Sequence, residues 1–210
     1  MNYESYAFRH ADRLLVGMDA WADLRAAIQR FDSDLVVERH LELTSDKLER
    51  GVSTPAGAQT AMNSLFEDFL PDPPWTHQPR LFRQSKSGPG VGVDPLKMSL
   101  WKMDFLRDRL GVEVAFNHAE AVAWQFTRLN IAGESERVLA ESQIDVGVVV
   151  AADQSLKSWG RMDSAVLTFE TCRAWLREMR AILPIPILVV GLSAASWAPT
   201  TVFRGTRKHS

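Results

Sequence analysis

The sequence contains a single cysteine, Cys172, among 210 residues, and this excludes an intramolecular disulfide. It has no apolar run near the roughly 20 residues that a membrane-spanning helix needs. Its first residues show neither the basic stretch nor the apolar core of a signal peptide. We therefore expect a protein of the cytoplasm with no membrane partner, and we expect Cys172 to be a packed thiol in a helix.

The sequence also lacks a strong net charge, because it contains 24 Lys and Arg and 26 Asp and Glu, for a formal charge of −2. The basic residues nevertheless gather in two places, at 80–102 and in the C-terminal tail. Phosphate binding depends on a local basic surface and not on the total charge. Two interpretations stay open, namely scattered solvated side chains and a surface that contacts nucleic acid.

The length and a hydrophobic content of 46% suit one α/β domain with a sizeable core. Apolar residues at three- and four-residue spacing predict helices, and short continuous apolar runs predict buried strands. The helices are expected at 21–34, 58–70, 119–131 and 167–182, and the strands at 111–116, 144–150 and 185–192. Residues 35–37 suit a short strand or a helix end, and 44–51 suit a loop or a frayed helix. This alternation predicts a central mixed sheet flanked by helices.

The most informative segment runs from Met103 to Asn117. It places Asp104 in a charged turn and, nine residues later, Glu113 inside an apolar strand. Strand alternation puts Glu113 and Ala115 on the same face. A carboxylate among apolar neighbours is costly to bury unless something neutralises it. A cation held jointly with Asp104 would do so, because Mg²⁺ prefers oxygen ligands.

The spacing alone also allows a purely structural interpretation. In that interpretation Asp104 caps a turn, and Glu113 pairs with an arginine such as Arg109. Asp94 and Asp108 are rival first carboxylates, although neither has the same distance along the chain from Glu113.

The segment resembles the catalytic core of type II restriction endonucleases of the PD-(D/E)XK superfamily, in the BglII/BstYI (BamHI-like) branch. That branch carries an Asp, a Glu nine residues later, and a Gln or Glu two residues beyond it. The similarity extends from about residue 20 to 192, through two N-terminal helices and the strands at 143–148 and 184–192. It implies the restriction-endonuclease-like α/β fold. It also implies a single endonuclease domain over 1–210, mainly helical in 1–80, with a catalytic core in 81–192 and a basic tail in 193–210.

The resemblance further implies Mg²⁺-dependent hydrolysis of phosphodiester bonds at a short palindromic site in double-stranded DNA, with GATC as the expected core. Mn²⁺ or Ca²⁺ would be substitutes for Mg²⁺, and a homodimer is expected because a palindrome has two-fold symmetry. Asp104, Glu113 and a backbone carbonyl of Val114 or Ala115 would hold the metal. Two alternatives stay open: a sequence-specific DNA-binding protein that no longer cuts, and a nonspecific repair nuclease.

Ala115 departs from the family pattern at a catalytic position. A methyl group can neither take a proton nor hold a water, so we expect impaired cleavage. Three explanations stay open. The alanine is an engineered substitution that traps a DNA complex, or the chain is a natural relative with weakened activity, or His118 or Glu120 has taken over the role.

The resemblance also implies DNA contacts. Asn117 and His118 follow the catalytic strand, and an amide or a ring nitrogen can read bases in the major groove. Asp163 and Ser164 match a second base-contacting loop, and Arg204 matches an arm along the minor groove. The alternatives are a polar turn at 117–118, a helix N-cap at 163–164 and an unstructured basic terminus. Asn63 and Glu67 would lie on a helix that faces the active site.

Overall fold

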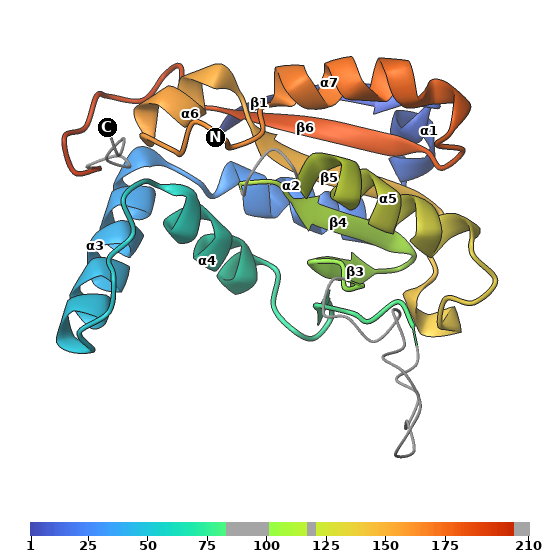
Figure 1. Ribbon diagram of the computed structural model, residues 1–210, viewed down its shortest axis with the longest axis horizontal. Coiled ribbons are helices and arrows are strands. Elements are labelled where there is room, and N and C mark those ends of the chain that lie inside the picture. The colour runs from blue at the N-terminus through green and yellow to red at the C-terminus, as the bar shows by residue number, and fades with distance from the viewer. Residues whose placement is uncertain (83–100, 117–120, 204–210) are drawn as a thin grey trace, which may run out of the picture.

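The computed structural model describes residues 1–82, 101–116 and 121–203. Six strands form one mixed sheet in the order β1-β6-β5-β4-β3-β2 (Figure 1). Strands β4, β5 and β6 are parallel, and the other neighbouring pairs are antiparallel. The strands are β1 (Asn2–Phe8), β2 (Thr76–His77), β3 (Phe105–Arg107), β4 (Leu110–Val114), β5 (Val146–Ala152) and β6 (Ile187–Ser193). The expected α/β fold with a central mixed sheet is confirmed.

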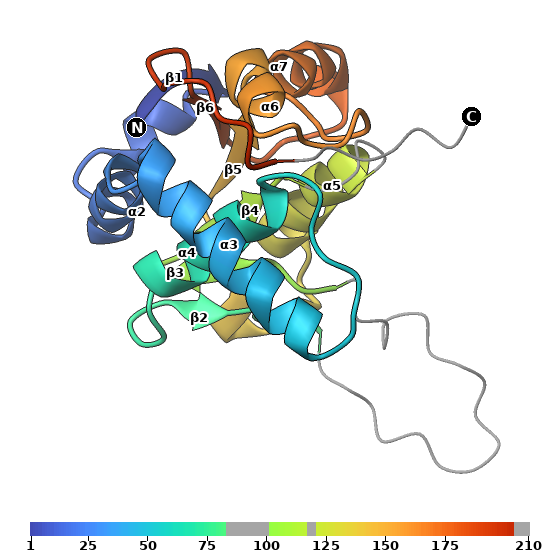
Figure 2. The same ribbon diagram turned by 90° about the vertical axis from the view of Figure 1, so that its left-hand side faces the viewer.

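Helices cover both faces of the sheet (Figures 1 and 2). Helices α1, α2 and α4 pack on one face, and α5 and α7 pack on the other. The helices are α1 (Ala11–Leu15), α2 (Asp19–Gln29), α3 (Ser33–Glu49), α4 (Gln59–Phe69), α5 (Ala121–Glu134), α6 (Gln154–Trp159) and α7 (Phe169–Glu178), with short 3-10 turns at Ala140–Ser142 and Met179–Ala181. None of the helices in the described ranges is long and apolar enough to cross a membrane.

Most of the expected elements are confirmed within a few residues. Helices α2, α4, α5 and α7 and strands β4, β5 and β6 lie where the apolar patterns predict them. Cys172 is buried in α7, as expected. Residues 35–37 and most of 44–51 belong instead to the long helix α3, so the strand and loop interpretations of these segments were wrong. Strand β1, which pairs with β6 along its whole length, was not predicted.

The loop between β3 and β4 corrects the expected position of Asp104. The turn consists of Asp108 and Arg109, which both have positive φ, 49° and 63°. Two such residues in a two-residue hairpin match the right-handed twist of the flanking strands. Asp104 is therefore not in the turn, because it directly precedes β3.

The parallel strands bring β4 and α5 close together. Gly147 of β5 faces Leu129 of α5, and a Cβ on this glycine would lie 2.8 Å from Leu129 Cδ1. The glycine therefore lets the helix approach the sheet more closely than any side chain would. Glu113 pairs in register with Val149, two residues beyond Gly147 on the same face. The side of the sheet that carries Glu113 is thus the side that α5 covers.

Candidate functional site

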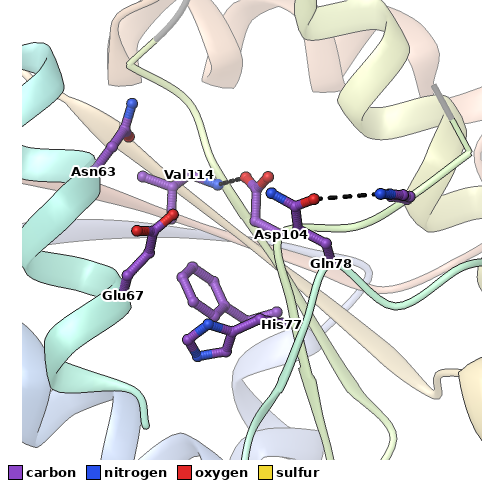
Figure 3. A pocket seen from close by; sticks show the side chains of 8 residues that line it. Asn63, Glu67, His77, Gln78, Asp104 and Val114 are labelled. Carbon is purple, nitrogen blue, oxygen red and sulfur yellow. Dashed lines mark hydrogen bonds between the residues drawn. The ribbon is translucent and has the colours of Figure 1, made fainter. Parts of the chain in front are cut away.

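A cavity of about 570 Å³ opens between α4 and the edge of the sheet at β3 and β4. Figure 3 shows Glu67 of α4 and Asp104 reaching into it from opposite walls. Its lining consists of Asn63, Glu67, His77, Gln78, Lys102, Asp104, Phe105 and Val114. The mixture of carboxylate, amide, imidazole and ammonium groups makes this a polar cavity suited to a charged ligand.

Asp104 is held in place by the strand next to it. Its Oδ2 accepts a hydrogen bond from the backbone N–H of Val114 at 2.7 Å (Figure 3). The backbone carbonyl of Asp104 also accepts from the N–H of Gln78 at 2.9 Å. Main-chain contacts on both sides therefore fix where this carboxylate points.

Glu113 lies on β4 and is fully buried. Its Oε1 accepts from Nε of Arg128 at 2.8 Å, and its Oε2 accepts from Nη2 of the same arginine at 2.5 Å. Such a two-pronged contact is the strongest geometry between a guanidinium and a carboxylate. Glu113 does pair with an arginine, but Arg109 is not its partner. Arg109 instead forms a paired contact with Asp145, at 2.7 and 2.6 Å, on the surface.

The two carboxyl groups expected to converge do lie together. Besides burial, the charge of Asp104 raises the pKa of Glu113, as a neighbouring carboxylate does. Burial raises the pKa of Asp104, and the hydrogen bond from Val114 opposes that rise. Burial likewise raises the pKa of Glu113, and the contact with Arg128 opposes it. Two acids in contact are stable as ions only when positive charge stands beside them.

The ionisation of the Glu113–Arg128 pair is decided by its geometry. The raised pKa of Glu113 favours a neutral acid. For Arg128, burial lowers the pKa, but the contacts with Glu113 more than offset this and raise it, which favours the ion pair. Both oxygens of Glu113 accept N–H groups, as an ionised carboxylate does, so we assign an ion pair.

The donor set fits a hard divalent cation. Asp104 and Glu113 supply two neighbouring carboxylates, and Asp104 and Val114 line the cavity. Within the described ranges, no group of three or more His, Cys, Asp and Glu residues is placed to hold a metal. Mg²⁺ is commonly held by one or two carboxylates and keeps several waters. Asp104, which lines the cavity, and the buried Glu113 next to it supply two such carboxylates.

Ala115 follows β4 and is 1% exposed. It packs in the same apolar cluster as Phe126 and Leu129 of α5. Its backbone N–H donates to the carbonyl of Val150 at 2.7 Å, which continues the pairing with β5. The position therefore lies beside Glu113 on the face under α5, and it brings no polar group there.

The expected DNA-contacting residues are placed only in part. Asn117, His118 and Arg204 lie outside the described residues, as does Glu120, the alternative catalytic group. Ser164 is exposed, and Asp163 accepts a hydrogen bond from the N–H of Ala165 at 2.8 Å. The N-cap of the following helix, α7, is Thr168, so the helix N-cap interpretation of 163–164 was wrong.

Several residues at or near the cavity were not singled out from the sequence. Arg128, which binds Glu113, is the most consequential, and His77, Gln78 and Lys102 line the cavity around Asp104. A signal for Arg128 does exist, since it lies beside the apolar stripe of Phe126 and Leu129 and therefore at the border of the helix face that meets the sheet. By contrast, Asn63 and Glu67 do lie on α4 at the cavity, as the resemblance implies.

Comparison with known proteins gives a consistent result. The family model described as restriction endonuclease BglII/BglIII matches residues 3–192. The chain is similar to the crystal structure of BglII complexed with a DNA 16-mer, with a TM-score of 0.64 and 15% identity over 92% of this chain and 77% of that one. It is also similar to free BglII, with a TM-score of 0.52 and 13% identity over 91% and 79%. No curated protein matches the chain.

Proposed function

Because the chain belongs to the restriction endonuclease BglII/BglIII family and is therefore a type II restriction endonuclease, we propose that Asp104 and Glu113 are its metal ligands. The metal would be Mg²⁺, and the substrate would be a short palindromic site in double-stranded DNA. Enzymes of this family use divalent metal ions. The single observation that supports the assignment best is that Asp104 lines a polar cavity and has the carboxyl group of Glu113 as its neighbour.

Each residue would have a distinct task in the reaction. Asp104, oriented by the N–H of Val114, presents one carboxylate oxygen to the cation. Glu113 presents the second carboxylate from the adjacent strand. The backbone carbonyl of Val114 is the proposed third protein ligand. A bound divalent cation would polarise the scissile phosphate and lower the pKa of the attacking water.

Lys102 supplies a positive charge on the same wall of the cavity. Its Nζ lies 3.4 Å from Oε1 of Gln78, at the long end of the range for a hydrogen bond. A loosely held ammonium can turn toward a phosphate without leaving a buried partner unpaired. We assign Lys102 to the binding of the DNA backbone near the cut.

The proposed substrate follows from symmetry and from the family. The solved BglII complex contains a DNA 16-mer, which supports double-stranded DNA as the partner of this chain. A palindrome presents the same half-site twice, and a two-fold dimer reads it with identical surfaces. We propose a homodimer with GATC at the centre of its site. Asn117, His118, Asp163, Ser164 and Arg204 are the proposed DNA contacts.

A second candidate function is favoured by Ala115. With a buried methyl group in place of a polar side chain, the chain would bind its site specifically and cut it slowly or not at all. Metal and DNA binding would then survive better than cleavage. A nonspecific repair nuclease lacks a comparable supporting observation.

The experiment that separates these functions is digestion of a DNA of known sequence with Mg²⁺, followed by mapping of the ends. The wild-type chain, Ala115→Gln and Ala115→Glu are compared. We expect discrete fragments with the same ends from all active forms, and faster cutting with a polar residue at 115. If discrete fragments come only from a variant at 115 and not from the wild-type chain, the wild-type chain binds its site without cutting it. A smear of fragments would contradict site-specific cleavage.

Asp104→Asn is the matched control, because it keeps the shape of the side chain and removes its charge. We expect this substitution to lower the cleavage rate by at least about 100-fold, since charge stabilisation is the main contribution of such a site. An Asp104→Asn enzyme that cuts at the wild-type rate would contradict the proposed function.

A further inference from the structure

Arg128 forms the most buried ion pair among the described residues. Glu113 is fully buried, and the side chain of Arg128 is 13% exposed. In every other ion pair of the described residues, both side chains are at least 17% exposed. The pair also occupies both oxygens of a carboxylate that touches Asp104. A positive charge therefore already stands beside the carboxylate that is proposed to hold the metal.

The fold delivers this arginine to a definite place. Helix α5 covers the face of β4 that carries Glu113, and its close approach depends on Gly147 under Leu129. Ala115, the next residue on that face, adds only a methyl group. The charge beside Glu113 on this face therefore comes from the helix and not from the strand.

Counting charges shows what the arginine does to the site. Asp104 and Glu113 together carry a charge of −2 when ionised, and Arg128 reduces the sum to −1. Each carboxylate oxygen has two lone pairs, so a contact with Arg128 leaves room for a metal on the same oxygens. The metal and the arginine would then share Glu113, and each would weaken the hold of the other through repulsion of like charges.

We propose that Arg128 is a positioning residue that fixes the Glu113 carboxylate and shares it with the catalytic metal, which makes metal binding weaker but cleavage faster. This inference rests on the proposed function, in which Asp104 and Glu113 are the metal ligands. Removing the arginine then changes two quantities in opposite directions once both acids are ionised. Metal affinity rises because the site becomes more negative, and cleavage slows because the carboxylate is no longer held in one orientation.

The test measures binding of Mn²⁺ alone to the full chain without DNA, at a pH high enough to ionise both acids, alongside the rate of DNA cleavage. For Arg128→Met we expect roughly tenfold tighter Mn²⁺ binding, from the loss of one positive charge close to the metal. We expect cleavage to slow by about 100-fold, as misplaced catalytic groups commonly cause. Arg128→Lys keeps the charge and loses the two-pronged contact, so its Mn²⁺ affinity should remain close to that of the wild type while its cleavage falls.

Arg109→Met is the matched control, because it also removes an arginine that makes a two-pronged contact, but at an exposed position. It should leave Mn²⁺ affinity unchanged. If Arg128→Met is poorly folded without metal, the rise in melting temperature on adding Mn²⁺ replaces the titration. That rise should exceed the rise of the wild type, because ligand binding to the native state alone stabilises it.

Glu113→Gln separates failure of this inference from failure of the proposed function. If Glu113→Gln binds Mn²⁺ as tightly as the wild type, the proposed metal site is wrong. If Glu113→Gln loses Mn²⁺ while Arg128→Met binds it no more tightly than the wild type, the metal site stands and the role of Arg128 is overturned.

Discussion

At the scale of single residues, three charged groups determine the properties of the proposed metal site. Asp104 and Glu113 are acids in contact, and Arg128 is the cation that lets at least one of them ionise away from water. A buried ion pair adds little to stability, whereas loss of one partner typically costs about 3–5 kcal/mol. This asymmetry explains why a site with such a pair can remain folded before any metal binds.

The raised carboxyl pKa values give a prediction with a definite sign. Burial raises the pKa of both Asp104 and Glu113, so each stays protonated to a higher pH than an ordinary carboxyl group. A metal binds only the ionised form. Mn²⁺ affinity should therefore fall as the pH is lowered, by up to about tenfold per pH unit for each proton that must leave, and should begin to fall well above pH ~4.5.

A titration of Mn²⁺ binding at a series of pH values measures this effect. The raised pKa values also affect the stability of the fold, but in the opposite direction. As the pH rises, the two carboxyl groups ionise, and the ionised form opposes folding, so stability falls while metal affinity rises. Glu113→Gln removes both a titrating group and a proposed metal ligand, so it should bind Mn²⁺ weakly at every pH. A wild-type affinity that stays constant down to about pH 5 would contradict the raised pKa values.

The sequence predicted the two acids but not their arginine. The nine-residue spacing and the apolar neighbours of Glu113 are local features, and the resemblance to a family attached a role to them. The pair with Arg128 joins residues 15 positions apart on two elements, and their contact depends on how α5 crosses the sheet. The position of Arg128 at the border of an apolar helix face does not by itself identify Glu113 as its partner, and Arg109 was the partner considered from the sequence.

At the scale of secondary structure elements, burial explains which predictions succeeded. Strands β5 and β6 are covered on both faces, so their continuous apolar runs identified them. Strand β1 lies at the edge of the sheet and is mostly exposed, so it has no such run. Helix α3 was missed because the β-branched residues near its start favour a strand. Its N-cap favours the helix, because the Asp32 side chain accepts a hydrogen bond from the N–H of Leu35 at 2.8 Å.

The close approach of α5 to the sheet gives a prediction at this scale. Gly147→Ala would place a methyl group 2.8 Å from Leu129 Cδ1, so α5 must shift or Leu129 must change rotamer. We expect the free energy of unfolding to fall by about 1–3 kcal/mol, as overpacking usually causes. Cleavage should slow as well, because the helix that carries Arg128 moves relative to Glu113. Urea unfolding and the digestion assay measure the two effects.

A double substitution checks the cause of this effect. Leu129→Ala creates space at the same contact, so Gly147→Ala should destabilise the Leu129→Ala protein less than it destabilises the wild type. Equal losses in both backgrounds would show that the methyl group acts through something other than its contact with Leu129.

At the scale of the whole molecule, aromatic contacts join the N-terminal helices to the end of the chain. Phe203 is fully buried and packs against His40 of α3 and Trp159 of α6, with ring centroids 4.8 and 5.1 Å apart. Phe203 directly precedes Arg204, which the resemblance matches to an arm along the minor groove. Phe203 anchors this part of the chain on the core.

His40 makes this anchor sensitive to pH. Its side chain is buried, and desolvation lowers its pKa below the usual value of 6.5. The folded protein therefore favours the neutral ring of His40. The neutral ring contributes its full share of stability above pH ~6.5, and this share is lost as the pH falls toward the lowered pKa of the folded state. We expect the free energy of unfolding of the wild type to fall by up to about 1.4 kcal/mol per pH unit from this group.

His40→Met is the comparison, because it fills a similar volume and does not titrate. The difference in unfolding free energy between wild type and His40→Met should change between pH ~7 and pH ~5 in favour of the variant. A difference that is independent of pH would show that His40 is protonated to the same extent in the folded and unfolded chain.

The central claim is that Asp104 and Glu113 share one divalent cation, and anomalous diffraction from crystals soaked in Mn²⁺ tests it most directly. The predicted result is an anomalous peak within coordination distance, about 2.0–2.2 Å, of an oxygen of each carboxylate, with Arg128 still in contact with Glu113. A peak elsewhere, or a fully occupied Mn²⁺ that touches neither carboxylate, would contradict the proposed site.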